Sequence, residues 1–260
     1  MPRVLLNETE VFYQDEGSGL PLMFVPGLGG THWMFAPQAE AFRVIRPDLR
    51  GNGGSGQLDG PIGTVIDRQC DDLAALMDVI GERSVVMVGV SYGGAVALEF
   101  ALRHSERLNG LVLVDTFGEL RAWRPMEGML LLGSYLTLGM YYLPRPVLKR
   151  VAGLFFHRWP TTHAAIPDLV DAFRPTEAVL QSIAMCRIKS VRQADRIFCP
   201  TLGIVGGWSG TAIRLMERVI GPIPKARLEI IPDSFDPSNL CQPEAFNHLL
   251  RAFLAEIQGA

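Results

Sequence analysis

Ser91 lies in a stretch whose residue types and spacing suggest nucleophilic chemistry. It is the central residue of a Gly-x-Ser-x-Gly sequence, Gly89 to Gly93, which Gly94 extends. An apolar run at 84–88 precedes this sequence and a helix-forming run follows it, so the pattern predicts a sharp strand-to-helix turn. Glycine has no Cβ to clash in such a turn, and the serine hydroxyl would stand clear of the sheet. We expect the first amides of the helix, starting with Tyr92, to be available to a developing oxyanion.

The elements that must position Ser91 alternate between strand and helix patterns along most of the chain. Strands are expected over 11–14, 22–25, 44–47, 84–88, 110–114, 201–205 and 228–231, and helices over 33–42, 66–80, 92–104, 212–220 and from Pro243 onward. Alternation of this kind predicts a mostly parallel sheet. The first two strands flank the turn 16–19 and resemble a hairpin.

A helical, strand-poor segment interrupts the alternation from about 117 to 190. Within it, residues 129–143 carry no charge, and Pro144-Arg145-Pro146 follows them. This stretch is shorter than the ~20 residues that a helix needs to cross a bilayer. The sequence therefore predicts a buried cap helix rather than a membrane span.

Composition restricts the class of protein. The chain has 260 residues, 48% of them hydrophobic, and a formal charge of -3, which fits one large α/β domain with or without a cap. Scattered lysines and arginines give no electrostatic footprint for nucleic acid. The apolar run at the N-terminus is too short for a signal peptide, so a cytoplasmic protein is expected. The four cysteines are widely spaced, which argues against a zinc site or a disulfide framework and predicts buried free thiols.

Two further glycine-rich loops follow expected strands. One is Pro26-Gly27-Leu28-Gly29-Gly30 and the other is Asp48-Leu49-Arg50-Gly51. With the turn at Ser91, these loops make the chain resemble the α/β-hydrolase superfamily, its esterase- and lactonase-like members, over essentially its whole length. The resemblance implies an α/β fold with a mostly parallel eight-stranded sheet flanked by helices. It also implies a hydrolase core at 1–117 and 191–260 and a helical lid at 118–190, inserted after the sixth strand.

The resemblance also assigns roles, and two of them are not filled by the usual residue. It makes Ser91 the nucleophile and the backbone amides of Leu28 and Tyr92 the oxyanion hole. The superfamily's acid usually follows the seventh strand as Gly-x-x-Asp, where this chain has Ser209. Its histidine usually follows the eighth strand, where this chain has Asp236. Loss of the histidine costs a triad hydrolase about 10⁶-fold in turnover, so ordinary Ser-His-Asp hydrolysis is not expected.

Other residues remain candidates for the site. Gly27, His32, Asp115 and Trp208 are expected near the pocket, and His157 and His163 lie in the expected lid. Asp115 ends the sixth strand, where some superfamily members hold their acid, although a cap is its ordinary role. A dyad of Ser91 with His32 or a lid histidine is one possibility. His104 is expected to be structural, and His248, off the apolar stripe of the last helix, to be a solvated surface residue.

Three functions stay open at this point. The first is a non-standard reaction on a small apolar carbonyl compound: elimination, cyclisation, slow acyl transfer or hydrolysis. The second is a hydrolase-like protein that binds a ligand or a protein without catalysis. Short segments at 143–156 and 239–241 resemble maspardin-like binding members of the superfamily. The third is an ester or thioester hydrolase with a relocated acid and base. No metal or cofactor is expected in any of them.

Overall fold

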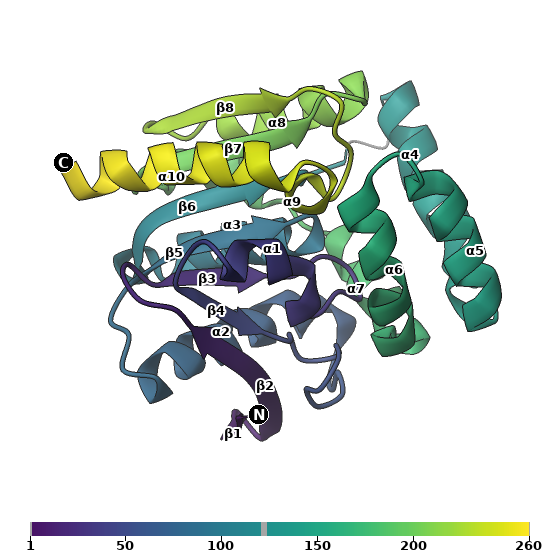
Figure 1. Cartoon of the computed structure of the whole chain (residues 1–260), viewed down its shortest axis with the longest axis horizontal. Coiled ribbons are helices and arrows are strands. Elements are labelled where there is room, and N and C mark those ends of the chain that lie inside the picture. The colour runs from purple at the N-terminus through teal and green to yellow at the C-terminus, as the bar shows by residue number, and fades with distance from the viewer. Residues whose placement is uncertain (1, 121–123, 260) are drawn as a thin grey trace.

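The computed structural model describes residues 2–120 and 124–259. Over these residues an eight-stranded sheet runs in the order β1-β2-β4-β3-β5-β6-β7-β8 (Figure 1). The strands are β1 (Arg3–Leu6), β2 (Thr9–Glu16), β3 (Leu22–Val25), β4 (Val44–Pro47), β5 (Val85–Val90), β6 (Leu108–Val114), β7 (Thr201–Gly206) and β8 (Ala226–Ile231). From β4 to β8 all neighbours are parallel, whereas β1 and β2 form an antiparallel edge. The predicted mostly parallel sheet is confirmed.

The predicted hairpin between the first two expected strands is wrong. β2 pairs with β1 and β4, and β3 lies between β4 and β5. All four residues of β3 are buried, as suits a strand covered on both faces. After the turn at 16–19 the chain therefore does not fold back beside β2. Instead, β3 takes a place inside the sheet, between β4 and β5.

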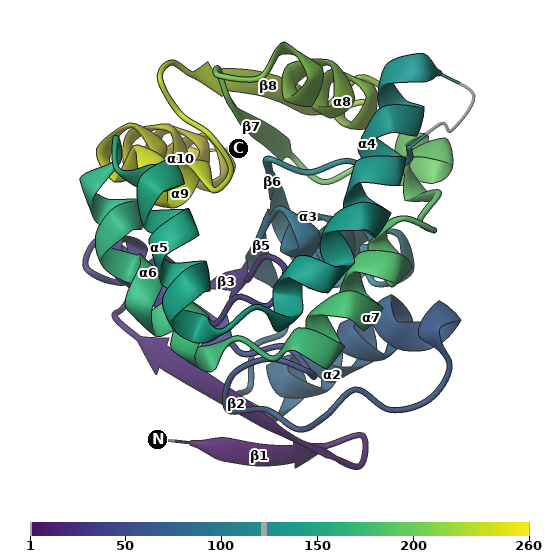
Figure 2. The same ribbon diagram turned by 90° about the vertical axis from the view of Figure 1, so that its right-hand side faces the viewer.

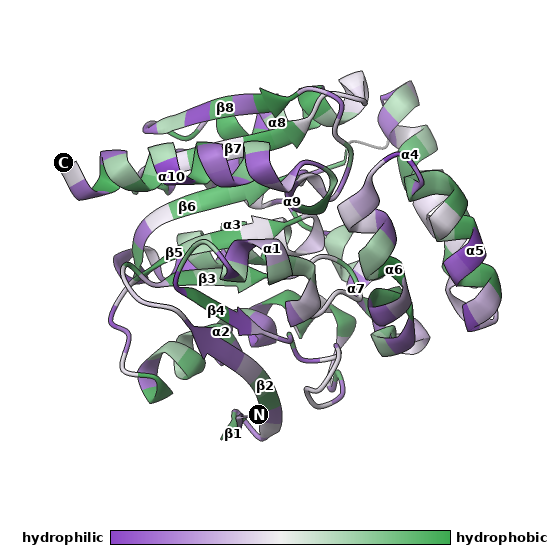
Figure 3. Ribbon diagram, viewed as in Figure 1, coloured by the Kyte–Doolittle hydropathy of each residue, from purple (hydrophilic) through white to green (hydrophobic). Residues whose placement is uncertain are grey.

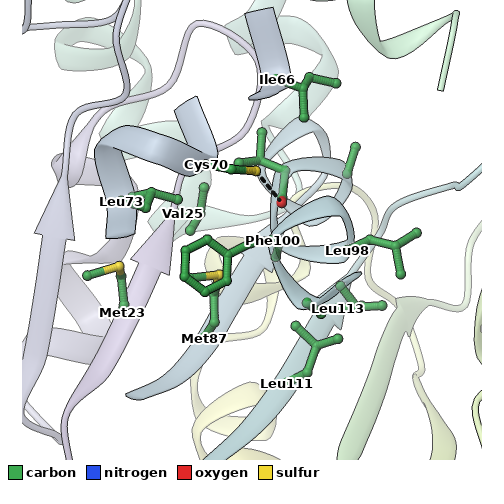
Figure 4. Close-up of a cluster of buried hydrophobic side chains, with 14 of the residues drawn as sticks. Met23, Val25, Ile66, Cys70, Leu73, Met87, Leu98, Phe100, Leu111 and Leu113 are labelled. Carbon is green, nitrogen blue, oxygen red and sulfur yellow. Dashed lines mark hydrogen bonds between the residues drawn. The ribbon is translucent and has the colours of Figure 1, made fainter. Parts of the chain in front are cut away.

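Along each central strand, successive side chains are buried on opposite faces of the sheet. Met23 and Met87 join a core under α2 (Val65–Val79), α3 (Tyr92–Arg103) and α8 (Gly210–Ile220). Figure 4 shows part of this core, where Cys70 donates a hydrogen bond to the carbonyl of Val96. Phe24 and Val88 join the second core, under α1 (Ala36–Ala39) and α10 (Pro243–Gly259). Figure 3 shows the central strands as the most hydrophobic part of the fold.

The helix expected over 33–42 is shorter than predicted. It consists of the 3-10 turn η1 (His32–Phe35) followed by α1, with Pro37 in the first turn of α1. The remaining short elements of the core are η2 (Ile62–Thr64), η3 (Ser105–Arg107) and α9 (Ser238–Cys241).

Between β6 and β7 the described residues form helices alone. They are α4 (Pro125–Thr137), η4 (Leu138–Tyr142), α5 (Arg145–Phe156), α6 (Pro160–Ala172), α7 (Pro175–Met185) and η5 (Ser190–Arg196). Prolines in the first turns of α4 to α7 suit those positions, because their missing N–H would have no partner there. Figures 1 and 2 show α4 to α7 beyond the carboxyl ends of the parallel strands.

The buried cap helix expected over 129–143 is not what the structure has. This stretch forms most of α4 and all of η4, and Met129, Leu132 and Leu136 are 68%, 59% and 73% exposed. The helices between β6 and β7 form a single layer that packs against the protein only on its inner side. An apolar helix in that layer therefore leaves its outer side uncovered. Within residues 2–120 and 124–259, every helix is too short or too polar to cross a membrane.

Candidate active site

Ser91 occupies a strained turn between β5 and α3. Its φ of 54° and ψ of -115° lie in a region that side-chain-bearing residues rarely adopt. A Cβ at Gly89 would lie 2.3 Å from the carbonyl oxygen of Gly93, and one at Gly93 would lie 2.1 Å from that of Val25. Thr116 further fixes the turn, since its hydroxyl donates to the carbonyl of Ser91 at 2.7 Å. The predicted strand-to-helix turn is confirmed, although β5 continues two residues beyond 88.

The side chain that meets the Ser91 hydroxyl belongs to Asp236. Ser91 Oγ donates a hydrogen bond to Asp236 Oδ2 at 2.8 Å. Asp236 lies on the loop between β8 and α9, 145 residues further along the chain and five residues after Ile231, which ends β8. The residue that replaces the usual histidine is therefore in direct contact with the nucleophile position.

The environment of Asp236 changes its acidity. Burial disfavours its ionised form, and the nearby Asp115 carboxyl adds like-charge repulsion, so the pKa of Asp236 rises to about 8. The hydrogen bond from Ser91 opposes this rise. At neutral pH the Asp236 carboxyl is mostly protonated. Above pH 8 it becomes an ionised base, far stronger than an ordinary carboxylate.

Asp115 connects three loops at the carboxyl edge of the sheet. Its Oδ1 accepts a hydrogen bond from the amide of Gly206 at 2.8 Å, and its Oδ2 accepts one from the amide of Ser238 at 2.7 Å. Burial raises the pKa of Asp115, and the two amides oppose that rise. Because only Asp115 receives two amide hydrogen bonds, we assign the negative charge of the pair to Asp115 and the shared proton to Asp236.

Ser209, at the usual position of the acid, caps a helix. Its Oγ accepts a hydrogen bond from the amide of Ala212 at 3.2 Å, at the N-terminus of α8. Ser209 also lines the same cavity as Ser91 and Asp236. The Ser209 hydroxyl carries no charge and cannot act as the orienting acid. The carboxyl that lies near Asp236 is that of Asp115.

The five histidines of the chain all fall within the described residues, and none lines a cavity at Ser91. His32 is buried, and its Nδ1 lies 2.9 Å from Asp48 Oδ1. His104 stacks on Phe100, and His248 is exposed. His157 is exposed with its Nδ1 on the carbonyl of Leu154, and His163 lies beside Gly153. The dyad of Ser91 with His32 or a lid histidine, which the sequence left possible, is therefore not what the structure has.

Two cavities meet at Ser91. The first, of about 330 Å³, lies under α4 and α7, and we call it the α4 cavity. The second, of about 360 Å³, lies between the 27–30 loop and α6, and we call it the α6 cavity. Leu28, Ser91 and Asp236 line both cavities. The α4 cavity is bounded mainly by apolar and hydroxyl-bearing side chains: Phe117, Leu130, Ser134, Thr137, Tyr141, Ser182, Met185, Thr211, Leu215 and Phe235.

Of the other expected pocket residues, Gly27 lines the α6 cavity and Asp115 lines the α4 cavity. Trp208 lines neither of them. It is 54% exposed, its ring packs against Trp159, and Arg158 lies over it at 5.2 Å. The expectation for Trp208 is wrong because its side chain turns outward from the end of β7.

The 27–30 loop is held by two residues that sequence reasoning missed. Gln181 of α7 accepts a hydrogen bond from the amide of Gly29 at 3.3 Å and donates one to Asn52 at 2.8 Å. Asn52 in turn donates to the carbonyl of Gly30 at 2.9 Å. The loop carrying Leu28 is thus tied to a helix 152 residues away. A glutamine within an apolar helical pattern is the only sequence signal for this contact.

Across the described ranges, no cluster of three or more His, Cys, Asp or Glu side chains is arranged to hold a metal ion. All four cysteines are free, and burial raises the pKa of each thiol. The site at Ser91 therefore consists of a serine, two carboxyls, and walls that are mainly apolar or hydroxyl-bearing.

A strained serine between a central parallel strand and a helix, below a helical insertion, defines a protein of the hydrolase-fold class. Residues 21–165, more than half of the chain, match the family described as alpha/beta hydrolase fold. The chain belongs to that family, which confirms the resemblance seen in the sequence.

Similar proteins cover the chain almost completely. "Putative carbamate hydrolase RutD" of Azorhizobium caulinodans is 26% identical, with 99% of both chains covered. 3-Oxoadipate enol-lactonase 2 of Acinetobacter baylyi is 27% identical over 90% of this chain and 88% of its own. The crystal structure of an enol-lactonase from Burkholderia xenovorans LB400 superposes with a TM-score of 0.80 and 23% identity, covering 98% of this chain and all of the other.

Proposed function

We propose that this protein hydrolyses a small, mostly apolar ester or lactone by a non-standard route, with Ser91 as nucleophile and Asp236 as its base. The observation that carries the proposal is the 2.8 Å hydrogen bond from Ser91 Oγ to Asp236 Oδ2. A nucleophile and its base must be within such reach for proton transfer. The proposal gives Asp236 the histidine's task and gives Asp115 the task of the orienting acid.

The pKa of Asp236 makes this assignment chemically reasonable. An ordinary carboxylate, with a pKa near ~4, is a weak base toward an alcohol. The pKa of about 8 at Asp236 brings its basicity into the range of a catalytic histidine. The cost is that only the minority ionised form acts at neutral pH.

The reaction would follow the two-step route of acyl transfer. Ionised Asp236 takes the proton from Ser91 Oγ as that oxygen attacks the substrate carbonyl carbon, and a tetrahedral intermediate forms. Asp236 then gives the proton to the leaving oxygen as the carbon–oxygen bond breaks, which leaves an acyl group on Ser91. A water molecule, deprotonated by Asp236, attacks the acyl carbon and releases the acid. Asp236 then returns the proton to Ser91.

The backbone amides of Leu28 and Tyr92 would form the oxyanion hole. Tyr92 begins α3, and the amides of a first helical turn have no partner within the helix. Leu28 borders both cavities next to Ser91, on the loop that Gln181 holds. A carbonyl oxygen between these two amides would place its carbon beside Ser91 Oγ.

The cavities and the relatives point to the substrate class. Two cavities that meet at Ser91 suit a carbonyl compound with one group on each side of the reacting carbon. The apolar walls under α4 favour an apolar group there. Helices within 118–190 would act as the lid that excludes water. The names of the relatives, an enol-lactonase and a carbamate hydrolase, also describe acyl hydrolysis.

One observation favours a second function, binding without turnover. Because Asp236 is mostly protonated at neutral pH, its O–H could donate a hydrogen bond to a bound carbonyl in place of removing a proton from Ser91. The protein would then hold a carbonyl ligand in the same cavities and release it unchanged.

Labelling of Ser91 by a fluorophosphonate probe as a function of pH separates the two functions. For hydrolysis we expect labelling that rises through pH 8 and that Ser91→Ala abolishes, together with turnover of p-nitrophenyl butyrate that follows the same pH curve. A wild-type protein that labels no faster than Ser91→Ala at any pH would contradict the hydrolase proposal and leave the binding function.

A further inference from the structure

The outer surface of the helices over the site is unusually apolar. On α4, Met129, Leu132 and Leu136 recur at intervals of three or four residues, which places them on one stripe, and Met140 follows in η4. All four are between 45% and 73% exposed. A stripe of this kind on a solvent-facing helix is usually charged or polar, so its apolar character calls for a partner.

The opposite stripe of the same helices is accounted for. Leu130, Ser134, Thr137 and Tyr141 line the α4 cavity, so they serve the site. The outer stripe has no such role. It is as apolar as the inner one, and residues 128–144 contain no charge that would keep it in water.

The next helix, α5, carries a second exposed apolar stripe at the same end of the molecule. Val147, Val151, Leu154 and Phe155 recur at helical spacing and are 43%, 47%, 70% and 52% exposed. Figures 1 and 2 show α4 and α5 as the outermost helices at the same end of the molecule, beyond the carboxyl ends of the strands. We call these eight residues, Met129, Leu132, Leu136, Met140, Val147, Val151, Leu154 and Phe155, the outer apolar surface.

Positive charge accompanies this surface. Residues 124–158 contain five lysines and arginines and one acidic residue, whereas the whole chain has 24 basic and 27 acidic residues. Lys149 and Arg158 form ion pairs with Asp171 and Asp233. Arg145 and Arg150, both exposed on α5, have no acidic partner within the described residues. The unpaired positive charge of this segment therefore lies on α5, at Arg145 and Arg150, in a chain that is negative overall.

We propose that the outer apolar surface docks onto an anionic phospholipid membrane. Apolar side chains that enter the interface, combined with basic residues that meet anionic headgroups, are the two features of a helix that lies on a membrane. A second copy of this chain is a poorer match, because a two-fold interface would bring the same positive surface against itself.

Vesicle sedimentation tests the proposal independently of catalysis. We expect the full-length protein to sediment with vesicles of phosphatidylcholine mixed with phosphatidylglycerol, and much less with vesicles of phosphatidylcholine alone. Arg145→Ala with Arg150→Ala should weaken binding to the anionic vesicles about 25-fold, about fivefold for each charge. Added salt should weaken wild-type binding in the same direction.

A matched pair of surface variants tests the apolar contribution. Leu136→Asn with Leu154→Asn should abolish sedimentation, whereas Leu5→Asn, at a site 72% exposed on β1, should leave it unchanged. All three leucines are largely exposed, so the variants should keep the wild-type thermal unfolding midpoint.

Three results would each overturn the proposal. One is a wild-type protein that stays in the supernatant with both kinds of vesicle. Another is equal binding to neutral and anionic vesicles. The third is a wild-type dimer in analytical ultracentrifugation that the variant with Leu136→Asn and Leu154→Asn converts to a monomer, which would assign the surface to a second copy. Turnover of p-nitrophenyl butyrate should be unaffected by these variants, so a failure of docking and a failure of the hydrolase proposal are distinguishable.

Discussion

Ser91 Oγ donates its hydrogen bond to Asp236 Oδ2 at 2.8 Å, in the place where hydrolases of this fold usually have a histidine. A carboxyl, at the position where the resemblance led us to expect a histidine, is thus in direct contact with the Ser91 hydroxyl. Burial and the nearby Asp115 raise the pKa of that carboxyl to about 8. A titratable group therefore lies beside Ser91, and under the proposed function its pKa sets the pH at which the protein acts.

The first prediction concerns the pH dependence of activity. Because Asp236 must be ionised to act as the base, turnover by the wild type should rise through about pH 8 and level off above it. Asp236→Asn should lower turnover by about 10²- to 10⁴-fold and remove this pH dependence. Ser209→Ala is the control, and its pH curve should match that of the wild type. A wild-type curve that levels off near pH 5 would contradict the assignment.

The second prediction concerns stability. The pKa of Asp236 is about 8 in the folded protein, whereas an aspartate in the unfolded chain has a pKa near ~4. Between pH ~4 and pH 8 the folded state therefore binds a proton that the unfolded state has lost, so the free energy of unfolding falls as the pH rises. The contribution of the Asp236 proton to the stability of the folded state is complete below pH ~4 and is lost as the pH rises through 8. Asp236→Asn cannot ionise, so it should melt at a higher temperature than the wild type at pH 9, by a few degrees.

Calorimetric scans of both proteins from pH 4 to pH 9 measure this effect. The difference between their melting temperatures should grow steadily with pH over that window and stop growing above pH 8. A constant difference across the window would mean that the Asp236 carboxyl keeps its ordinary pKa in the folded protein.

The sequence predicted the turn at Ser91 well because its requirements are local. A Cβ at Gly89 or Gly93 would lie only 2.3 Å or 2.1 Å from a backbone carbonyl oxygen, so both positions require glycine. This requirement is visible directly in the residue types. The alternation of strands and helices was equally readable, since buried parallel strands such as β6 are continuous apolar runs.

The state of Asp236 was not predictable in this way. Its acidity depends on burial and on Asp115, which lies on a different strand end 121 residues earlier in the sequence. Residue type alone gives an aspartate the ordinary pKa near ~4, because burial is a property of the packed loops. The outward turn of Trp208 and the contact of Gln181 with the 27–30 loop are likewise set by tertiary packing.

The third prediction tests the role of Asp115 by rebuilding a triad. Asp236→His should place an imidazole between Ser91 and the Asp115 carboxylate, and we expect esterase activity at pH 7 to rise about tenfold or more, because the base no longer needs ionisation at pH 8. Adding Asp115→Asn should cancel the gain. If the gain instead requires Ser209→Asp, the orienting acid belongs at the end of β7 and our assignment to Asp115 is incorrect.

The fourth prediction concerns the loop that carries Leu28. Gln181→Leu removes the acceptor of the Gly29 amide and the donor to Asn52, so the 27–30 loop should lose its fixed position relative to Ser91. Misplacement of an oxyanion donor by about 1 Å costs on the order of 10²-fold in turnover. We expect kcat to fall by roughly that factor with KM little changed. Gln258→Leu, at an exposed position on α10, is the matched control.

The last prediction tests the turn itself. A methyl group at Gly93 would lie 2.1 Å from the carbonyl oxygen of Val25 and 2.5 Å from that of Pro26, and both are backbone atoms that cannot rotate away. Gly93→Ala should therefore destabilise the fold by about 3 kcal/mol or more, measured by urea unfolding. Gly133→Ala, at a helical site on α4 where an added Cβ meets nothing within 4 Å, should be neutral or slightly stabilising. Equal effects of the two substitutions would show that the approach of α3 to the end of β3 is looser than these distances require.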